Sequence, residues 1–404
     1  MELQGKYANA KVFTKDLEDG AKEQIINLLN QDFIEGSKVR IMPDVHQGMG
    51  CVIGFTADMG DKVIPNIVGV DIGCGMLTVE LGGLDIDLAT LDKIIYNKIP
   101  AGNKVHNSKK YDFDRLKDLH CLRDLKNRKR IERSVGTLGG GNHFIEVGLD
   151  DDKNKYLVIH SGSRNLGKQV AEIYQRLAID LCSGKEDYFI KKDEIIKTYK
   201  GENRRKDIKK ALKELEKEYK DLKPKYPKDL CYLTGEYRER YLHDMKMCQE
   251  YASANRMAMA DIILKALLDK SLDGFNYFET IHNYIDFKDN IIRKGAISAY
   301  KDEKLLIPIN MRDGSILAKG KGNPDWNFSA PHGAGRLMSR SIAKEELTLD
   351  EFKKSMKGIY STSINESTLD ESPYAYKPIE DILENIHDTV EIISFIKPIY
   401  NFKA

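Results

Sequence analysis

VRIMPDVHQGMGCVIGFTADMGDKVIPNIVGVDIGCGMLTVE, residues 39–80, is dense in glycine and in short β-branched runs. Runs of this kind, separated by small residues, are typical of strands joined by tight turns. Helical periodicity is absent from this segment. We therefore predict that residues 39–80 contribute strands rather than helices.

Residues 184–227 have a different texture, since they are rich in charge and poor in glycine. Within them, apolar residues recur at intervals of four, three, four and three: Ile208, Leu212, Leu215, Tyr219 and Leu222. This spacing places them on one stripe of a helix. Pro224 and Pro227 end the helix, because proline lacks an N–H and clashes with the preceding turn. We predict a charged helical hairpin that protrudes from the body and has no catalytic role.

Two further helices are indicated outside this insertion. One runs over about 239–270, where apolar residues, several of them methionines, recur at helical spacing and are interpreted as core. Thr348 and Glu351 have capping-box spacing and open the other. No internal repeat and no linker rich in proline, glycine or serine divides the chain. We predict one α+β domain over residues 1–404, with mixed β-sheets flanked by helices and a helical insertion at about 184–227.

The composition is that of an ordinary globular protein, with 41% hydrophobic and 31% charged residues. Lysine and arginine number 64 against 63 aspartates and glutamates, which gives a formal net charge of +1. A nucleic-acid site on such a chain has to be a local patch. No apolar run is long enough for a bilayer, and the N-terminus lacks the pattern of a signal peptide. We expect a cytoplasmic, monomeric protein without membrane contact.

Histidine and cysteine gather where strand-like runs end. Four histidines besides His332 lie at such positions: His46, His143, His160 and His282. Asp71 and Cys74 share the glycine-rich stretch GVDIGCGM. Each alone is more often a structural residue than a ligand, but together they form the donor set of a zinc or manganese site. A thiolate can bridge two cations, so Asp71 and Cys74 suit a two-metal centre as well as a single zinc.

A second group of residues indicates phosphate binding. In HGAGR, residues 332–336, glycines expose backbone N–H groups ahead of a predicted helix, whose N-terminus would attract an anion. Arg336 and Arg340 are four residues apart and are expected on one face of that helix. Ser161–Arg164 is a second candidate anion site. The basic run KNRKRIER, residues 126–133, either contacts a nucleic-acid backbone or is a solvated helix face, and we give both interpretations equal weight.

Several motifs together carry a resemblance to a known family. In chain order they are MPDVHQGMG, GVDIGCG, GTLGGGNHFIEV, IHSGSRNLG, HNY, SAPHGAGRLMSR, SPYAYK and the terminal FKA. In this order and context they resemble the RtcB-type RNA-splicing ligases, from about Arg40 to Ala404. The combination is far more specific than any one of the motifs.

The resemblance implies a role for each candidate residue. His332 occupies the place of the histidine that attacks the α-phosphorus of GTP and then carries GMP. Two Mn²⁺ ions, bridged by the cysteine, would be held by Asp71, Cys74, His143, His160 and His282. The guanine nucleotide would be contacted by Asn142, Phe144, Glu146, His332, Gly333, Ala334, Gly335, Tyr376 and Lys403. RNA phosphates would be held by Arg164, Arg336 and Arg340.

The reaction that the resemblance implies joins RNA ends. GMP passes from His332 to an RNA 3′-phosphate, formed where necessary by opening a 2′,3′-cyclic phosphate, and a 5′-hydroxyl then attacks as GMP leaves. The substrate would be a tRNA or rRNA, in splicing or in repair, with or without an accessory activator protein. Two other classes stay open: a metal-dependent phosphoesterase or nucleotidase that uses the same site, and a non-catalytic RNA-binding factor.

The chain departs from the family pattern at Pro331, at Asn165 and in LIPINMRDGS, residues 306–315. None of these departures falls on the expected nucleophile or metal ligands. The altered loop leaves the nucleotide preference open, and the helical insertion leaves the RNA substrate open.

Overall fold

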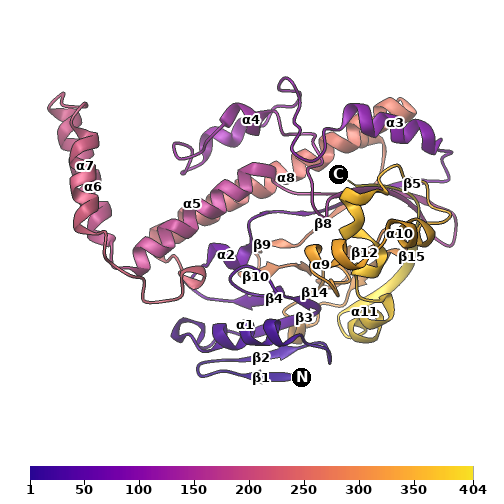
Figure 1. The fold of residues 1–404 in the computed structure, drawn as a ribbon, viewed down its shortest axis with the longest axis horizontal. Helices are drawn as coiled ribbons and strands as arrows, with labels where there is room; N and C mark the ends of the chain where they lie inside the picture. Colours follow the sequence, from indigo (N-terminus) through magenta and orange to yellow (C-terminus); the bar gives the residue numbers. More distant parts are fainter. Residues whose placement is uncertain (404) are drawn as a thin grey trace.

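Two large β-sheets and the long helix α8 (Gly235–Leu268) form the frame of the chain (Figure 1). The computed structural model describes residues 1–403, so Ala404, the last residue of the predicted domain, lies outside the described part. α8 packs on strands of both sheets. The predicted α+β class, with mixed sheets flanked by helices, is confirmed. Within residues 1–403, no helix combines the length and the apolar character needed to cross a membrane.

The first sheet has six strands in the order β1-β2-β3-β4-β10-β9. Their bounds are Glu2–Gln4 (β1), Asn9–Val12 (β2), Val39–His46 (β3), Ile53–Asp58 (β4), Asn283–Ile285 (β9) and Ile291–Lys294 (β10). β2 and β3 run parallel, whereas the other neighbours are antiparallel. The register of β3 against β4 shifts between Ile41 and His46. Such an irregularity bends a strand and re-aims its side chains, and Asp44, which lies within it, is completely buried.

The second sheet has seven strands in the order β12-β13-β15-β6-β7-β5-β8, all of them antiparallel. Their bounds are Gly75–Gly82 (β5), Phe144–Leu149 (β6), Lys155–Ser161 (β7), Tyr277–Ile281 (β8), Lys304–Asn310 (β12), Gly314–Gly320 (β13) and Val390–Lys403 (β15). Residues 39–80 therefore supply β3, β4 and most of β5, as predicted. Their one departure is the short helix α2 (Pro65–Val68), which begins at a proline because the first helical residue needs no N–H donor.

A third sheet has two strands, the first of which lies in the sequence between β10 of the first sheet and β12 of the second. It pairs β11 (Ala296–Ser298) with β14 (Ser329–Pro331) in antiparallel fashion. Both strands are buried except at the half-buried Ser298, and Ile297 and Ala330 belong to one hydrophobic cluster. β14 ends directly before His332, so strand pairing fixes the backbone that leads to this residue.

The remaining helices cover the sheets and connect their strands. Their bounds are Asp19–Leu29 (α1), Leu88–Lys98 (α3), Arg128–Glu132 (α4), Arg164–Cys182 (α5), Glu186–Gly201 (α6), Ile208–Glu218 (α7), Arg340–Glu346 (α9), Leu349–Ser355 (α10) and Ile379–Ile386 (α11). Short 3₁₀ turns lie at Asp32–Ile34, Asp114–Asp118, Lys228–Leu230, Leu272–Gly274, Pro324–Trp326, Glu366–Glu371 and Pro373–Ala375. The capping box predicted for Thr348 and Glu351 is present and opens α10. The helix predicted over 239–270 is α8.

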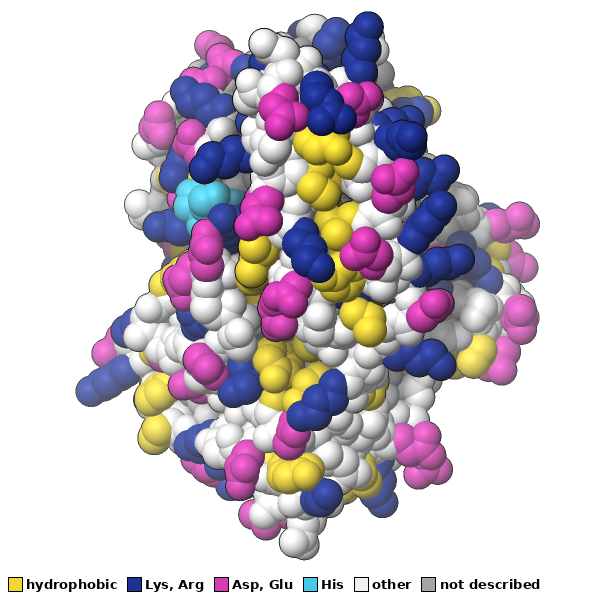
Figure 2. Space-filling model, turned by 90° about the vertical axis from the view of Figure 1, so that its left-hand side faces the viewer, with side chains coloured by type: hydrophobic (Ala, Val, Ile, Leu, Met, Phe, Trp, Pro, Cys, Tyr) yellow, Lys and Arg dark blue, Asp and Glu magenta, His cyan; other side chains and the backbone are white. Residues whose placement is uncertain are grey.

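Helices α6 and α7 occupy the predicted insertion and project from the body as a hairpin (Figure 1). The face on that side mixes basic and acidic side chains around an apolar band (Figure 2). Leu215 is buried within the hairpin. α7 ends at Glu218, earlier than the apolar spacing predicted, so Tyr219 only caps it and Leu222 is exposed.

Candidate active site

Four of the five predicted metal ligands lie at one end of four neighbouring strands. β6, β7, β5 and β8 are adjacent in this order. His143 directly precedes β6, Cys74 directly precedes β5 and His282 directly follows β8. His160 lies near the end of β7, where the register sets it opposite the starts of β6 and β5. The pairing of the strands therefore gathers residues that are far apart in the sequence.

The structure brings all five predicted ligands into two overlapping groups. One group is Asp71, Cys74 and His143, and the other is Cys74, His160 and His282; within each group the donor atoms lie within 4.8 Å of one another. Sγ of Cys74 lies 3.4 Å from Nε2 of His143 and 3.3 Å from Nε2 of His160. Cys74 is the shared member, which is the arrangement that a thiolate bridging two cations requires.

Backbone carbonyls fix the tautomers of two of these histidines. Nδ1 of His143 donates to the carbonyl of Leu138 (2.9 Å), and Nδ1 of His160 donates to the carbonyl of Asn142 (3.1 Å). The lone pair of each ring is therefore on Nε2, as in histidines that ligate metals. Burial lowers the pKa of His160 and of His282 well below the ordinary value, so both rings are neutral at pH 7.

The chemistry of the cluster fits a bound cation. Oδ1 of Asp71 is buried and has no hydrogen-bond partner within residues 1–403, and an unpaired buried oxygen of this kind is costly. Burial and the charge of Asp71 raise the pKa of the Cys74 thiol well above its ordinary value. A cation reverses this effect, because a coordinating thiol is deprotonated. The residues present can thus hold a metal, and a metal would satisfy them.

Two buried residues of α8 hold the segments that carry the ligands. Oδ1 of Asn255 accepts hydrogen bonds from the backbone N–H groups of 136–137, at 2.8 and 2.9 Å. The guanidinium of Arg256 donates to the carbonyls of Gly73 and Ser161, both at 2.8 Å. Each of these segments leads into or out of a predicted ligand. Sequence analysis assigned α8 to the core and missed this role; an Asn-Arg pair within an apolar helix is the signal that could have found it.

His332 lies beside the predicted ligands. Its ring centroid is 4.8 Å from that of His282. Its Nδ1 donates to Oδ2 of Asp44 (2.6 Å), and the same oxygen accepts a hydrogen bond from the His332 backbone N–H (3.1 Å). Because Nδ1 carries the proton, Nε2 has the lone pair that a nucleophile needs. Asp44 was not predicted; its signal is a charge within the strand-like run VRIMPDVH.

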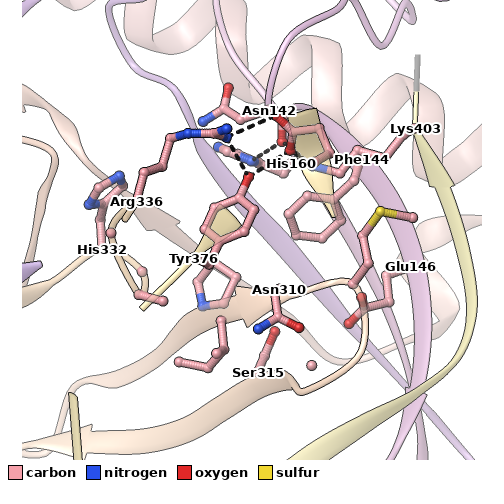
Figure 3. Close-up of a pocket in the computed structure, with 18 of the residues that line it drawn as sticks. Asn142, Phe144, Glu146, His160, Asn310, Ser315, His332, Arg336, Tyr376 and Lys403 are labelled. Atoms are coloured by element: carbon pink, nitrogen blue, oxygen red, sulfur yellow. Dashed lines mark hydrogen bonds and ion pairs between the residues drawn. The ribbon is translucent and has the colours of Figure 1, made fainter. Parts of the chain in front are cut away.

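A cavity of about 220 Å³ opens next to His332 (Figure 3). All nine residues predicted to contact the nucleotide line it: Asn142, Phe144, Glu146, His332, Gly333, Ala334, Gly335, Tyr376 and Lys403. Asn310 and Ser315 line it as well; the stretch 306–315, expected as a loop, is the end of β12, a short turn and the start of β13. His332 and Glu146 lie on opposite sides of the view. The cavity therefore has a candidate nucleophile at one end and a carboxyl group at the other.

Comparison with known proteins identifies the family. The sequence model of a family described as tRNA-splicing ligase RtcB matches residues 24–404. The chain belongs to the RtcB family. RNA-splicing ligase RtcB of Escherichia coli K12 is 29% identical over 98% of both chains, and RtcB1 of Escherichia coli ATCC 25922 is 30% identical over 98% of both. The tRNA-splicing ligase RtcB of Nanoarchaeum equitans is 26% identical over 98% of this chain and 94% of its own. The predicted resemblance, and with it the RNA-ligase class of enzyme, is confirmed.

In this RtcB-family chain, Arg336 and Arg340 do not share a helix face, and that prediction is wrong. The helix α9 begins only at Arg340. Arg336 lies before it, in a bridge with Tyr376. The hydroxyl of Ser339 accepts a hydrogen bond at the start of α9 and caps it. The helix therefore begins later than predicted, so the glycines after His332 lie upstream of its first turn, and their part in anion binding stays a prediction.

Both arginines converge instead on two carboxylates that sequence analysis missed. Nη1 of Arg340 lies 2.8 Å from Oδ2 of Asp370 and 3.0 Å from Oε1 of Glu371. Nη1 of Arg336 lies 3.5 Å from the same oxygen of Glu371. Lys403 forms an ion pair with the other oxygen. Although burial acts to raise the pKa of Glu371, the charges of Lys403 and Arg340 hold it below its ordinary value.

Glu146 is an almost fully buried carboxyl group in the cavity wall. Burial raises its pKa to about 8, against the opposing effects of a hydrogen bond from Asn401 and the charge of Lys403. Nδ2 of Asn401 donates to Oε2 (2.8 Å), whereas Oε1 has no hydrogen-bond partner within residues 1–403. At pH 7 the group is mostly protonated and can donate a hydrogen bond into the cavity.

Arg164, the third predicted RNA contact, has different partners from the other two. Its Nη1 is 3.3 Å from Nδ1 of His143. The guanidinium packs over Gly139, where an added Cβ would lie 1.8 Å from Nη1 and displace it, and where the φ of +84° also favours glycine. The predicted RNA contacts therefore form two groups: Arg164 beside the predicted metal ligands, and the two arginines paired with carboxylates.

Proposed function

We propose that this chain joins RNA 3′-phosphate or 2′,3′-cyclic phosphate ends to 5′-hydroxyl ends, using GTP, two Mn²⁺ ions and a covalent His332–GMP intermediate. The position of His332 carries the proposal. It lies on the wall of the 220 Å³ cavity lined by the predicted nucleotide contacts and 4.8 Å, ring to ring, from the predicted ligand His282. Its Nδ1 is bound by Asp44, which leaves the lone pair on Nε2.

The residues that would hold the two Mn²⁺ ions are Asp71, Cys74, His143, His160 and His282, with Cys74 shared. Carboxylate, imidazole and thiolate donors suit manganese or zinc, and the choice of manganese comes from the family resemblance. When bound, the ions would neutralise charge on the phosphoryl oxygens beside His332. The protein's part is to hold these ligands at fixed strand ends.

In the first step, Nε2 of His332 attacks the α-phosphorus of GTP. A P–N bond forms and the bond to pyrophosphate breaks. The ring gains positive charge, which Asp44 stabilises through the hydrogen bond from Nδ1–H. The nine cavity residues predicted for the nucleotide would bind and orient GTP, and the protonated Glu146 would donate a hydrogen bond to it.

The later steps transfer GMP and join the ends. An oxygen of the RNA 3′-phosphate attacks the phosphorus of His332–GMP, and the P–N bond breaks. The 5′-hydroxyl oxygen then attacks the 3′-phosphate; the phosphodiester forms, GMP leaves and the hydroxyl proton passes to solvent. Arg164, Arg336 and Arg340 are proposed to contact RNA phosphates. We further propose a tRNA or rRNA substrate, a cytoplasmic monomer and compatibility with an accessory activator.

Covalent labelling tests this function. The protein is incubated with Mn²⁺ and α-labelled GTP, and label on the protein should be labile in acid and stable in alkali, as a phosphoramidate is. We expect His332→Ala to abolish labelling and RNA sealing while the metal content stays at the wild-type level, because His332 is assigned to phosphorus. Metal content is measured by elemental analysis of the purified variant.

Other outcomes would contradict specific parts of the proposal. Loss of metal in His332→Ala would make His332 a ligand. Release of phosphate from RNA ends or nucleotides without protein labelling would support a metal-dependent phosphoesterase or nucleotidase. RNA binding without either activity would support a non-catalytic RNA-binding factor.

A further inference from the structure

A second cavity, of about 330 Å³, adjoins the predicted metal ligands through Arg164. Four cationic side chains line it: Lys104, Arg130, Arg164 and Lys168. None of its lining residues is acidic; the others are neutral and include Ser134 and Asn165. On a chain with a formal net charge of +1, this is a local concentration of positive charge.

The charges of this cavity are largely uncompensated. Within residues 1–403, Lys104, Arg130 and Arg164 form no direct ion pair with a carboxylate; Arg164 feels the charge of Asp71, but its Nε is buried without a hydrogen-bond partner. Lys168 has only an exposed pair with Glu172, at 3.8 Å. Arg336 and Arg340 differ, because Asp370 and Glu371 already neutralise them. An added anion therefore gains more in the second cavity than beside the paired arginines.

The first turn of α5 adds to the attraction for anions. Arg164 and Asn165 belong to this turn, Lys168 begins the next one, and the helix extends to Cys182. The N-terminal end of a helix of this length carries partial positive charge. Arg130 comes from the basic run 126–133 and is half-buried in the wall of the cavity.

We propose that this cavity binds backbone phosphates of the RNA strand next to its reacting end. The inference rests on the proposed function and names where the substrate lies. A site with several cationic side chains and no acidic one attracts the negative charge of backbone phosphodiesters. Contacts of this kind are independent of the base sequence. The contact of Arg164 with His143 sets the cavity next to the predicted metal ligands, where a bound strand would present its end. Arg130 then acts as a backbone contact, and the rest of the basic run as a solvated helix face.

The test is the double variant Lys104→Ala/Lys168→Ala in the full-length protein. Binding is measured by fluorescence anisotropy with labelled single-stranded RNA over a series of salt concentrations, and protein guanylylation is measured in parallel. We expect about tenfold weaker RNA binding at low salt and a slope of log affinity against log salt that is shallower by about 1.4, since each phosphate contact on a single strand contributes about 0.7. Guanylylation should be unchanged. Lys104→Arg/Lys168→Arg should retain binding, because charge is what matters.

The matched control is Lys209→Ala/Lys213→Ala, which removes two exposed lysines from the hairpin helix α7. Equal loss of affinity in both double variants would overturn the proposal in favour of unspecific attraction. Loss of guanylylation in the cavity variant would also overturn it and assign the cavity to the nucleotide. Separate RNAs, one ending in a 3′-phosphate and one in a 5′-hydroxyl, show which strand is held. Failure of the proposed function is distinct, because the wild type would then neither label nor seal.

Discussion

A single buried carboxyl group, Glu146, changes its acid–base behaviour because of where it lies. Its pKa rises from 4.5 to about 8, chiefly through burial. The folded state therefore binds a proton that the unfolded chain releases above about pH 4.5. The contribution of Glu146 to stability is full below that pH and is lost as the pH rises through about 8. The burial of Glu146 in the wall of the proposed nucleotide cavity thus lowers the stability of the protein at neutral pH.

We predict that Glu146→Gln removes this cost. The free energy of unfolding of Glu146→Gln relative to wild type should increase by about 1.4 kcal/mol per pH unit between about pH 5 and 8, and then level off. Urea unfolding of the metal-free proteins at several pH values measures it. Glu384→Gln, at an exposed position of α11, is the control and should show no such slope. A flat difference for Glu146→Gln would mean that Glu146 is ionised in the folded protein.

At the scale of elements, α8 acts as a clamp on the loops of the predicted metal site. Arg256 is completely buried and joins Gly73 and Ser161, which belong to different strands' ends, to Glu279 at 2.8 Å. One guanidinium thus binds both carbonyls and one oxygen of Glu279, whose other oxygen accepts a hydrogen bond from the hydroxyl of Ser253 (2.6 Å). The element therefore couples the packing of the core to the position of Cys74.

We predict that Arg256→Met destabilises the protein by about 3 kcal/mol, because it leaves a carboxylate without its buried partner. Metal affinity should fall about tenfold or more, as it does when other residues that hydrogen-bond to and orient metal-binding segments are replaced. Thermal unfolding and metal titration measure the two effects. Arg240→Met, on an exposed turn of the same helix and paired with Glu236, should change stability by less than about 0.5 kcal/mol. Wild-type metal affinity in a folded Arg256→Met protein would contradict the clamp.

At the scale of the whole molecule, the chain leaves the body to form the hairpin α6–α7 and returns to it at a neighbouring position. The backbone N–H of Lys225 donates to the carbonyl of Cys182 (3.0 Å), across the base of the hairpin. The hairpin touches the body near that base, where the rings of Phe189 and Tyr237 lie 6.1 Å apart. We therefore expect that removal of the hairpin does not expose the hydrophobic core of the body.

We predict that replacing residues 186–223 by two glycines leaves guanylylation close to the wild-type value and does not lower the melting temperature, since shortening a surface loop reduces its entropic closure cost, here by about 2 kcal/mol. Calorimetry and covalent labelling with GTP test this. The same protein then shows, by its sealing of different RNAs, whether the hairpin contributes to substrate choice. A folded deletion protein that no longer labels with GTP would give the hairpin a part in catalysis and contradict the prediction.

Local patterns in the sequence carried much of the site. Motifs such as GVDIGCG and HGAGR identify the family, because residue types and spacing within a few positions are visible in the chain itself. The same holds for the capping box at Thr348 and for the charged hairpin, whose periodicity is a local property. The amphipathic stripe was extended too far at Tyr219 and Leu222, because helix ends depend on their surroundings more than on periodicity.

Only the tertiary structure decided which of these residues meet and what balances their charges. Strand register brings Cys74 to His143 and His160, and a bulged strand brings Asp44 to His332. Helix packing places Arg256 behind Gly73. The pairing of Arg336 and Arg340 with buried carboxylates, and the lack of an ion pair at Lys104, Arg130 and Arg164 among the described residues, follow from contacts between distant segments. The physical reason is common to all of them: hydrogen bonds and charge balance depend on distances in space, and the sequence specifies those distances only through the whole folded chain.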